Sequence, residues 1–505
     1  MSKVCLIIID GFGVAPAGPG NARSLANLPN ITKLEQEVPN VIIEASGNAV
    51  GLPKGQQGAS EPGHLTIGAG RIVWQPLEEI NREISSGKFF ENDVYVKACK
   101  RAVERGVPVH LFGIYSYGGV HGHMEHMHTL AILAEKQGVE DIYLHLIGDG
   151  RDVPKKQFCD DYEKLQAFLK DHLKVKAVSL IGRYYGMDRD KQYKDRTKLA
   201  YDLYTQGKGE EVDNLCEGAK AWHKKAPEKQ KTDYYIKPIK TSDFVSIKEE
   251  DAVIGVNFRI DRMFQIVDAL EKEDFSEFNR PVRIKDIVCT GPYSDHLPIA
   301  YPAPKLKNTL TEVVTNEGKN VLKIAETDKW AHTTFFFNGQ RDEAFRGEDR
   351  IMIDSPKVPN FASTPEMSAD ELTDKLIEKV EEEKYELIVV NFANPDLVGH
   401  GANIEAAVIA CETVDRNIGR LLPVLSSHNY EWIVTADHGN IEDMLLPDGK
   451  VSPSHTANPV QTFVKSSIIK SDDDLRECKG LKDIAPLILG MMEIDIPEEM
   501  KSIKQ

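Results

Sequence analysis

The sequence predicts an α/β protein in which a second α/β domain is inserted into a discontinuous parent domain. Apolar, strand-like runs near both ends of the chain finish at acidic residues, which is typical of strands in an open α/β sheet. A middle region has its own alternation of strand-like and helical stretches. The proline-containing stretch GPYSDHLPIAYPAPK reads as a stiff linker back to the parent domain. We therefore expect a parent domain at residues 1–74 and 305–505 and an inserted domain at residues 75–304.

The length and composition of the chain indicate a globular protein with more than one hydrophobic core. A chain of 505 residues is too long for a single core, and 41% hydrophobic with 28% charged residues is ordinary for a globular protein. The net charge of -17 argues against a nucleic-acid partner, which would require a basic face. No apolar stretch approaches the length of a membrane span, and the N-terminal run VCLIII is short enough to be a strand. We expect a cytoplasmic monomer with no membrane partner.

The seven cysteines are scattered along the chain, and none forms a CxxC pair. An odd number without regular spacing is typical of reduced thiols in a cytosolic protein. The sequence therefore predicts no disulfide framework and no zinc knuckle.

Three apolar runs end at residues that can bind metal ions. VCLIIID ends at Asp10, ELIVVNFANPD ends at Asp396, and EWIVTADH ends at Asp437 and His438. Because open α/β sheets bind ligands at the carboxyl ends of their strands, these side chains are expected in one site.

Two more imidazoles accompany these strand ends. His400 follows Asp396 by four residues, and SHT contributes His455. Mixed carboxylate and imidazole ligands suit manganese or zinc better than magnesium or calcium. Two such ions could hold a phosphoryl group and activate a hydroxyl as a nucleophile.

The candidate nucleophile is Ser60, in the glycine-rich segment GQQGASEPGHLTIGAGR. Glycines let the backbone approach a charged ligand closely, and a serine needs a base or a metal to become nucleophilic. A flexible surface loop with an ordinary serine is the alternative. The metal-ligand candidates elsewhere in the chain favour the catalytic interpretation.

Five motifs together resemble cofactor-independent phosphoglycerate mutase, a family of the alkaline-phosphatase-like superfamily. They are LIIIDGFG, GASEPGHLTIGAGR, NPDLVGH, TADHGN and SHTANP, in order from Asp10 to His455. TADHGN indicates only the superfamily, whereas the serine segment and the middle-region motifs indicate the mutase. The resemblance implies an alkaline-phosphatase-like parent domain with an inserted domain. It also implies interconversion of 3-phosphoglycerate and 2-phosphoglycerate in glycolysis and gluconeogenesis, without 2,3-bisphosphoglycerate.

The parent-domain motifs divide into two expected metal sites. Asp10, Ser60, Asp437 and His438 are assigned to one ion, and Asp396, His400 and His455 to the other. Manganese is the expected metal, with cobalt, zinc and magnesium as alternatives. Ser60 is expected to form a phosphoserine. Lys329, in AETDKWAHTTFFFNG, resembles a family residue that points at the phosphate; a solvated lysine is the alternative.

The middle region contains arginines after several strand-like runs. Arginine recognises carboxylate and phosphate in a planar, bidentate way, although any single arginine is more often a solvated surface charge. The motifs GGVHGH, DGRD, GRYYGMDRD and NFRIDR resemble substrate-binding motifs of the mutase family. The residues carried over are His121, Arg151, Asp152, Arg183, Arg189, Arg259 and Arg262. Asp152 is the candidate general acid or base, and His121 a phosphate or proton partner.

Other functions remain open from the sequence. A metal-dependent phosphatase, or another phosphomutase of the same superfamily, would use the same parent domain. A non-catalytic binding protein on this scaffold is a third possibility, against which the intact ligand set argues. The histidines of HGHMEHMH could form a third metal site or could simply pack the loop.

Overall fold

The computed structural model describes residues 2–501, which form two compact units. One unit contains residues 2–75 and 305–501, and the other contains residues 76–304. The first boundary lies one residue after the expected position, between Gln75 and Pro76, and the second lies at the expected position. Each unit has its own seven-stranded sheet, so the α/β class is confirmed.

The sheet of the first unit has β1 near its centre, between β12 and β13. β1, β10, β11, β12 and β13 run parallel, whereas β14 is antiparallel to both of its neighbours. Helices cover both faces, which is why the β1 sequence is continuously apolar and not alternating. In sheet order the strands are β11 (Glu348–Ile353), β10 (Val321–Glu326), β12 (Leu387–Phe392), β1 (Lys3–Ile9), β13 (Tyr430–Thr435), β14 (Val460–Lys465) and β2 (Asn40–Ile43).

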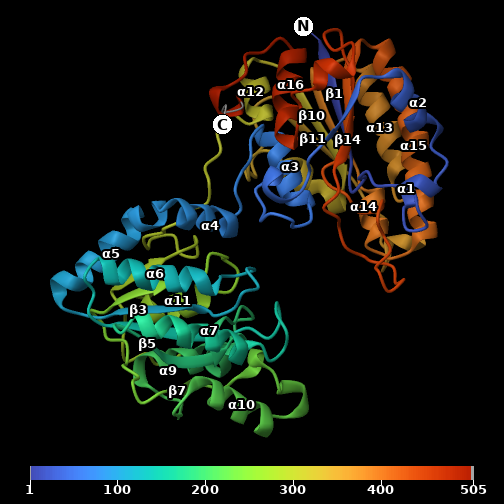
Figure 1. The fold of residues 1–505 in the computed structure, drawn as a ribbon. Helices are drawn as coiled ribbons and strands as arrows, with labels where there is room; N and C mark the ends of the chain where they lie inside the picture. The colour runs from blue at the N-terminus through green and yellow to red at the C-terminus, as the bar shows by residue number, and fades with distance from the viewer. Residues whose placement is uncertain (1, 502–505) are drawn as a thin grey trace. The chain divides into compact units, whose positions relative to one another are not determined.

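Two helical layers enclose this sheet (Figure 1). One layer contains α1 (Ala22–Leu25), α2 (Pro29–Glu37), α13 (Ala369–Glu381) and α15 (Ile404–Ser427). The other contains α3 (Ser60–Ala69), α12 (Leu310–Asn316) and α16 (Ile484–Met491). Short turns follow two strands: η6 (Thr327–Lys329) and η7 (His332–Phe336) after β10, and α14 (Asn394–Gly399) after β12.

The segment MSADELTDKLIEKVEEEKYE places Ser368 and Glu371 in the spacing of a capping box, which predicts that helix α13 begins with one. The helix does begin after Ser368, but that side chain makes no cap hydrogen bond. Its hydroxyl donates instead to the carbonyl of Asp354, and its backbone N–H donates to Glu326. The tertiary partners have replaced the local cap, so this detail of the prediction is wrong.

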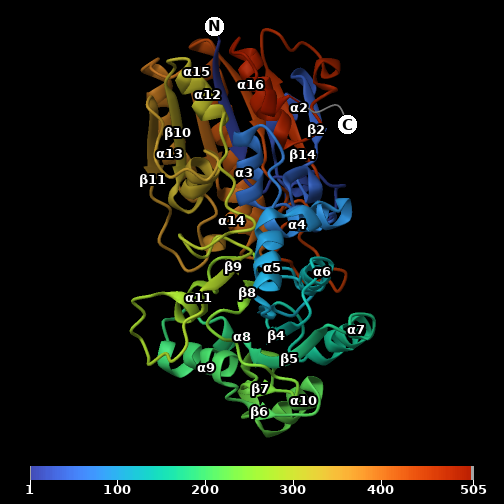
Figure 2. The same cartoon turned by 90° about the vertical axis from the view of Figure 1, so that its left-hand side faces the viewer.

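The second unit is a mainly parallel sheet between two helical layers (Figure 2). In sheet order the strands are β6 (Glu210–Glu211), β7 (Ile239–Lys240), β5 (Val175–Gly182), β4 (Ile142–Gly148), β3 (Val109–Ile114), β8 (Ala252–Gly255) and β9 (Asp286–Cys289). One core holds α4 (Pro76–Ser86), α5 (Asp93–Arg105), α6 (Met124–Lys136), α7 (Phe158–Asp171) and α10 (Leu215–Lys225). The other holds α8 (Arg183–Gly186), α9 (Lys198–Gln206) and α11 (Phe264–Glu271).

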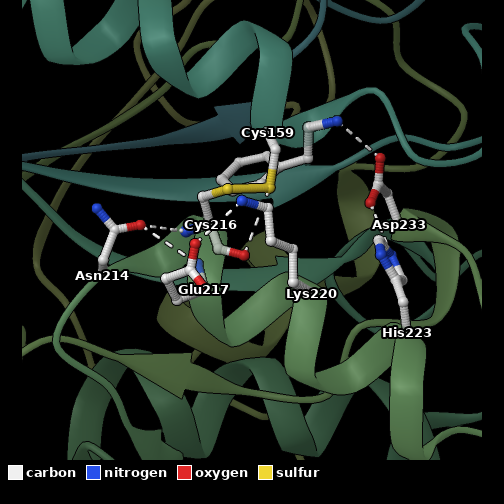
Figure 3. Close-up of a disulfide and its surroundings, with 8 residues drawn as sticks. Cys159, Asn214, Cys216, Glu217, Lys220, His223 and Asp233 are labelled. Atoms are coloured by element: carbon white, nitrogen blue, oxygen red, sulfur yellow. Dashed lines mark hydrogen bonds and ion pairs between the residues drawn. A yellow bond between two sulfur atoms is a disulfide. The ribbon is translucent and has the colours of Figure 1, made fainter.

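The prediction of seven reduced thiols is wrong for one pair. Cys159, in the first turn of α7, forms a disulfide with Cys216, in the first turn of α10 (Figure 3). The two Cα atoms lie 5.0 Å apart because the helices pack side by side. The two cysteines are 57 residues apart in the sequence, and no local sequence pattern indicates that their helices pack together. The other five cysteines are free and buried.

Within residues 2–501, none of the helices combines the length and apolar character needed to cross a membrane.

Candidate active site

Four neighbouring parallel strands of the first sheet deliver charged side chains to one edge. Asp10 follows β1, Lys329 ends the η6 turn after β10, Asp396 lies in α14 after β12, and Asp437 follows β13. All four side chains are almost completely buried. The structure therefore brings the predicted strand-end residues together, and it places the predicted Lys329 at the same edge, after a fourth strand.

Ser60 reaches this edge from the first turn of α3. Its Oγ lies 2.7 Å from Lys329 Nζ, 2.9 Å from His438 Nε2 and 3.2 Å from Asp10 Oδ1. The ten-residue helix directs its positive N-terminal end toward this oxygen, which favours an alkoxide or a phosphate there. Gly63 allows the close approach, because a Cβ at that position would lie 2.6 Å from the Asp437 carbonyl oxygen.

Lys329 places a positive charge among the buried carboxylates. Its Nζ lies 2.8 Å from Asp10 Oδ1 and 2.6 Å from Asp396 Oδ2. Burial alone would lower the pKa of Lys329, but the two aspartates outweigh it and raise that pKa. Burial alone would raise the pKa of Asp10 and Asp396, but the ammonium lowers both below the ordinary value. The three groups are therefore ionised at neutral pH.

Three histidines direct Nε2 toward the carboxylates, because the Nδ1–H of each ring donates to a backbone carbonyl. Such outer hydrogen bonds fix the ring and the tautomer of metal-binding histidines. The acceptors are Pro453 O for His400 (2.7 Å), Gly58 O for His455 (2.9 Å) and Gly439 O for His438 (3.1 Å).

The resulting arrangement of acceptor atoms fits divalent cations. His455 Nε2 and His400 Nε2 lie 3.1 Å apart, and they are 3.0 and 3.4 Å from Asp396 Oδ1. Lone pairs converging in this way require a proton or a cation between them. Asp437 Oδ2 is buried and makes no hydrogen bond, although His64 Nδ1 and His438 Nε2 lie 3.1 and 3.5 Å away, so it keeps a lone pair for a cation. Two candidate ligand groups result: Asp396, His438 and His455, and Asp10, Asp437 and His438.

Two contributors to this edge were missed in the sequence. His64, one turn after Ser60, donates from Nδ1 to the Ser60 carbonyl and lies 3.1 Å from Asp437 Oδ2. Asn391 Nδ2 donates to both Asp10 Oδ2 and His64 Nε2, at 2.8 and 3.0 Å. Both side chains are fully buried. The only sequence signals were a histidine in the serine segment and an amide within an aliphatic strand.

The second unit assembles its own polar cluster at one edge of its sheet. β3, β4, β5 and β8 run parallel, and the predicted residues follow their carboxyl ends. Arg183 is almost fully buried, and its Nη1 lies 2.6 Å from Asp149 Oδ1 and 2.5 Å from Asp152 Oδ2. Asp149 also accepts the backbone N–H groups of Arg151 and Asp152, so it supports this loop. Asp149 was missed although it belongs to the DGRD motif.

Asp261 is the other missed residue of this cluster. It lies 3.5 Å from His121 Nδ1, 2.8 Å from Arg189 Nη1 and 3.1 Å from Arg259 Nε. Burial and the nearby Arg183 charge lower the pKa of His121 to about 4, so its imidazole is neutral at pH 7. His121 Nδ1, Arg183 Nε and Asp261 Oδ1 are buried without hydrogen-bond partners. Unsatisfied buried polar atoms of both signs are typical of a ligand site.

The remaining predicted residues of this unit differ in their burial. Arg262 is buried and donates to the Met187 carbonyl at 3.2 Å, whereas Arg151 is exposed. The other histidines of HGHMEHMH have packing roles: His123 caps α6, His126 bonds Asn81, and His128 bonds Tyr115. Among residues 2–501, the ligand groups able to hold a metal do not include them.

Comparisons with known proteins agree with this geometry. Residues 2–496 match the Metalloenzyme superfamily. Over 98% of its length the chain is 44% identical to 2,3-bisphosphoglycerate-independent phosphoglycerate mutase 1 of Methanosarcina barkeri, covering 96% of that protein. The chain belongs to this mutase family. It is also 42% identical to the 2,3-bisphosphoglycerate-independent phosphoglycerate mutase of Moorella thermoacetica, over 98% of the chain and 96% of that protein.

A solved structure of the family has the same fold. The Leishmania mexicana phosphoglycerate mutase, crystallised at low cobalt concentration, aligns with a TM-score of 0.65 and 28% identity. The alignment covers 99% of this chain and 97% of that one. The superfamily match and the two ligand groups support the use of divalent metal by this mutase.

Metal binding by the mutase should release protons. Burial alone would lower the pKa of His438, but Asp437, Asp10 and Asp396 raise it to about 10, and Asp396 raises the pKa of His400. Only neutral imidazoles bind metal, so a proton must leave and affinity should rise with pH between about 6.5 and 10. Calorimetric titration with Mn²⁺ at pH 8, in two buffers of different ionisation enthalpy, measures the protons released. No proton release, or an affinity independent of pH, would contradict this account.

The same pKa shift predicts the stability of the metal-free protein. Folding raises the pKa of His438 from 6.5 to about 10, so its stabilisation is complete below pH 6.5 and is lost as pH rises toward 10. The melting temperature in chelator should therefore fall over this range, and saturating Mn²⁺ should reverse the trend.

Proposed function

We propose that the chain interconverts 3-phosphoglycerate and 2-phosphoglycerate through a phosphoserine on Ser60, without 2,3-bisphosphoglycerate. The observation that carries the proposal is the position of the Ser60 hydroxyl. It lies at a helix N-terminus and within 3.2 Å of Lys329, His438 and Asp10. This is the surrounding that a serine needs to act as a nucleophile toward phosphorus.

Residues of the first unit perform the phosphoryl transfer. Asp10, Ser60, Asp437 and His438 would hold one divalent cation, and Asp396, His400 and His455 the other. When bound, these ions supply positive charge that favours the serine alkoxide and the transferring phosphoryl group. Lys329 adds a fixed positive charge beside Ser60 Oγ. Manganese is the metal we infer, because nitrogen ligands disfavour magnesium.

Residues of the second unit hold the glycerate. Arg151, Arg183, Arg189, Arg259 and Arg262 supply charge for the carboxylate and phosphate of the substrate. Ser60 Oγ, as the alkoxide, attacks phosphorus, the bond from phosphorus to the glycerate oxygen breaks, and that oxygen takes a proton carried by a side chain of the second unit. Asp152 is the inferred proton donor, with His121 as its partner at 3.8 Å. The second half-reaction runs in reverse on the other hydroxyl, for which Asp152 accepts the proton.

A direct assay tests the proposal. The purified, Mn²⁺-loaded protein should convert 3-phosphoglycerate to 2-phosphoglycerate with no added 2,3-bisphosphoglycerate, and adding it should not raise the rate. Release of inorganic phosphate as the main product would instead identify a phosphatase. We also infer a cytoplasmic monomer; light scattering coupled to size exclusion tests the monomeric state.

The arginines should separate mutase activity from phosphatase activity. Arg259 is half-exposed and pairs with Asp261, so Arg259→Ala should leave the fold intact. It should lower mutase kcat/KM about tenfold or more, equivalent to at least ~1.4 kcal/mol, because glycerate escapes from the phosphoenzyme. The fraction of phosphate released per turnover should rise correspondingly.

A matched variant controls for the loss of a surface arginine. Arg105 pairs with Asp286 in the same unit, and Arg101 would still hold that aspartate, so Arg105→Ala should behave as wild type. In wild type, labelled free glycerate should not enter phosphoglycerate during turnover. Label entering at the turnover rate would show that glycerate is not retained, against the intramolecular scheme.

A further inference from the structure

The cysteines of this chain fall into two chemical classes. Five thiols are buried, and burial raises the pKa of each above its ordinary value, to about 12 for Cys99, Cys289, Cys411 and Cys478. Such thiols react poorly, because the thiolate is the reactive form. Cys159 and Cys216 are only partly buried, which distinguishes them from the other five.

The two paired cysteines occupy equivalent positions in two helices. Cys159 is the second residue of α7, and Cys216 is the second residue of α10. A thiol in the first turn of a helix faces unpaired N–H groups and the positive end of the dipole, which favours its thiolate. The Asn214 side chain caps α10 and so fixes the turn that carries Cys216 (Figure 3). The charge of the adjacent Glu217 is offset by Lys220 at 3.0 Å.

The disulfide lies next to the loop that carries Arg151 and Asp152. That loop, residues 149–157, runs directly into α7, so Cys159 anchors its C-terminal end. The loop rests on the turn η5 (Asp233–Tyr235): Asp233 N–H donates to the Lys155 carbonyl at 2.8 Å. A Cβ on Gly150 would lie 2.7 Å from Tyr234 N, so the two backbones are in close contact.

A second connection between α7 and α10 passes through Asp233. Its carboxylate accepts the Phe158 N–H at 2.8 Å and lies 3.0 Å from His223 Nε2, on α10 (Figure 3). Together with the disulfide, this contact attaches α10 to the start of α7 at two points. Breaking the covalent one leaves α10 linked to the start of α7 through the Asp233 contact.

We propose that Cys159 and Cys216 form a reversible disulfide that braces the loop bearing Arg151 and Asp152, and that reduction loosens substrate binding. Formation needs a low-molecular-weight disulfide as the oxidant. One protein thiolate attacks it and releases one small thiol, and the second protein thiolate attacks the mixed disulfide and releases the other. Two electrons pass to the external disulfide, and excess small thiol reverses both steps. The effect on substrate rests on the proposed function, whereas the redox chemistry does not.

The first test measures the redox state of the full-length, Mn²⁺-loaded protein. Glutathione buffers of increasing oxidised fraction are followed by alkylation and peptide mass spectrometry. Cys159 and Cys216 should oxidise together in one two-electron transition, with the other five thiols unchanged. Persistence of either thiol at the most oxidising ratio, or of the disulfide in excess dithiothreitol under native conditions, overturns the proposal.

The second test measures the brace by hydrogen exchange. Amides of residues 149–158 should exchange about threefold or more faster in the reduced protein. The double variant Cys159→Ser/Cys216→Ser should match the reduced protein in both buffers. Cys478→Ser, in the other unit, should respond as wild type does. Equal exchange in the oxidised and reduced proteins overturns the brace.

The third test is kinetic. Reduction should raise KM for 3-phosphoglycerate about three- to tenfold and leave kcat within about twofold. An unchanged KM overturns the link to substrate binding. Absence of conversion in both redox states would instead overturn the proposed function, while alkylation and exchange still decide whether the disulfide is a switch.

Discussion

Ser60→Ala should lower mutase turnover by about 10⁴-fold or more, because no covalent intermediate can form without the nucleophile. The fold should survive, since Lys329 keeps its ion pairs with Asp10 and Asp396 when the hydroxyl is removed. Steady-state assay and thermal unfolding measure the two quantities. In wild type, acid quenching during turnover and peptide mapping should place phosphate on Ser60.

A second serine provides the control for this variant. Ser46 lies outside the ligand groups and donates to the Ala457 carbonyl, so Ser46→Ala removes one hydroxyl without touching the centre. It should keep its activity within a few-fold. An active Ser60→Ala protein, or phosphate mapped to another residue, would remove Ser60 from the mechanism.

Chelation should abolish activity, and Mn²⁺ or Co²⁺ should restore it better than Mg²⁺. The reason is the donor set, in which imidazole nitrogens converge with carboxylates and Mg²⁺ prefers oxygen ligands. Removing metal also leaves the carboxylates at the sheet edge with only Lys329 and protonated histidine as counter-charges. Activity after exhaustive dialysis, with metal content measured by mass spectrometry, tests this.

Two histidine variants separate metal binding from loop packing. His455→Gln removes an Nε2 that lies 3.0 Å from Asp396, and it should weaken Mn²⁺ binding about 100-fold. His123→Gln alters the cap of α6 and should leave Mn²⁺ affinity unchanged. Full activity in a verified metal-free preparation would falsify the metal requirement.

The strand-end residues could be predicted because each ends an aliphatic run that is buried on both faces. Such a run reads as a parallel strand, and parallel strands place their last residues at one edge. His64 and Asn391 could not be predicted in this way. A histidine in a helix and an amide in a strand acquire their roles only when α3 packs beside β12, which no local pattern encodes.

The predictions about Cys159, Cys216 and Ser368 were wrong for the same physical reason. Cys159 and Cys216 meet because two helices pack together, and Ser368 finds Asp354 and Glu326 as partners from distant segments. Tertiary contacts override local signals in both cases. Asp149 and Asp261 were not predicted for a different reason. They stand inside recognised arginine motifs, and their pairing with arginine and histidine could have been expected from charge alone.

The central position of β1 determines the order in which the chain can fold during synthesis. β1 pairs with β12 and β13, which the ribosome makes only after residues 76–304. At a synthesis rate of roughly 5–20 residues per second, β12 and β13 are made roughly 20–80 s after β1. During that time the contiguous residues 76–304 can complete their own sheet. The apolar segment Val4–Ile9 therefore has no β12 or β13 to pair with during that time, and in a circular permutant beginning at Lys305 both strands would be made before β1.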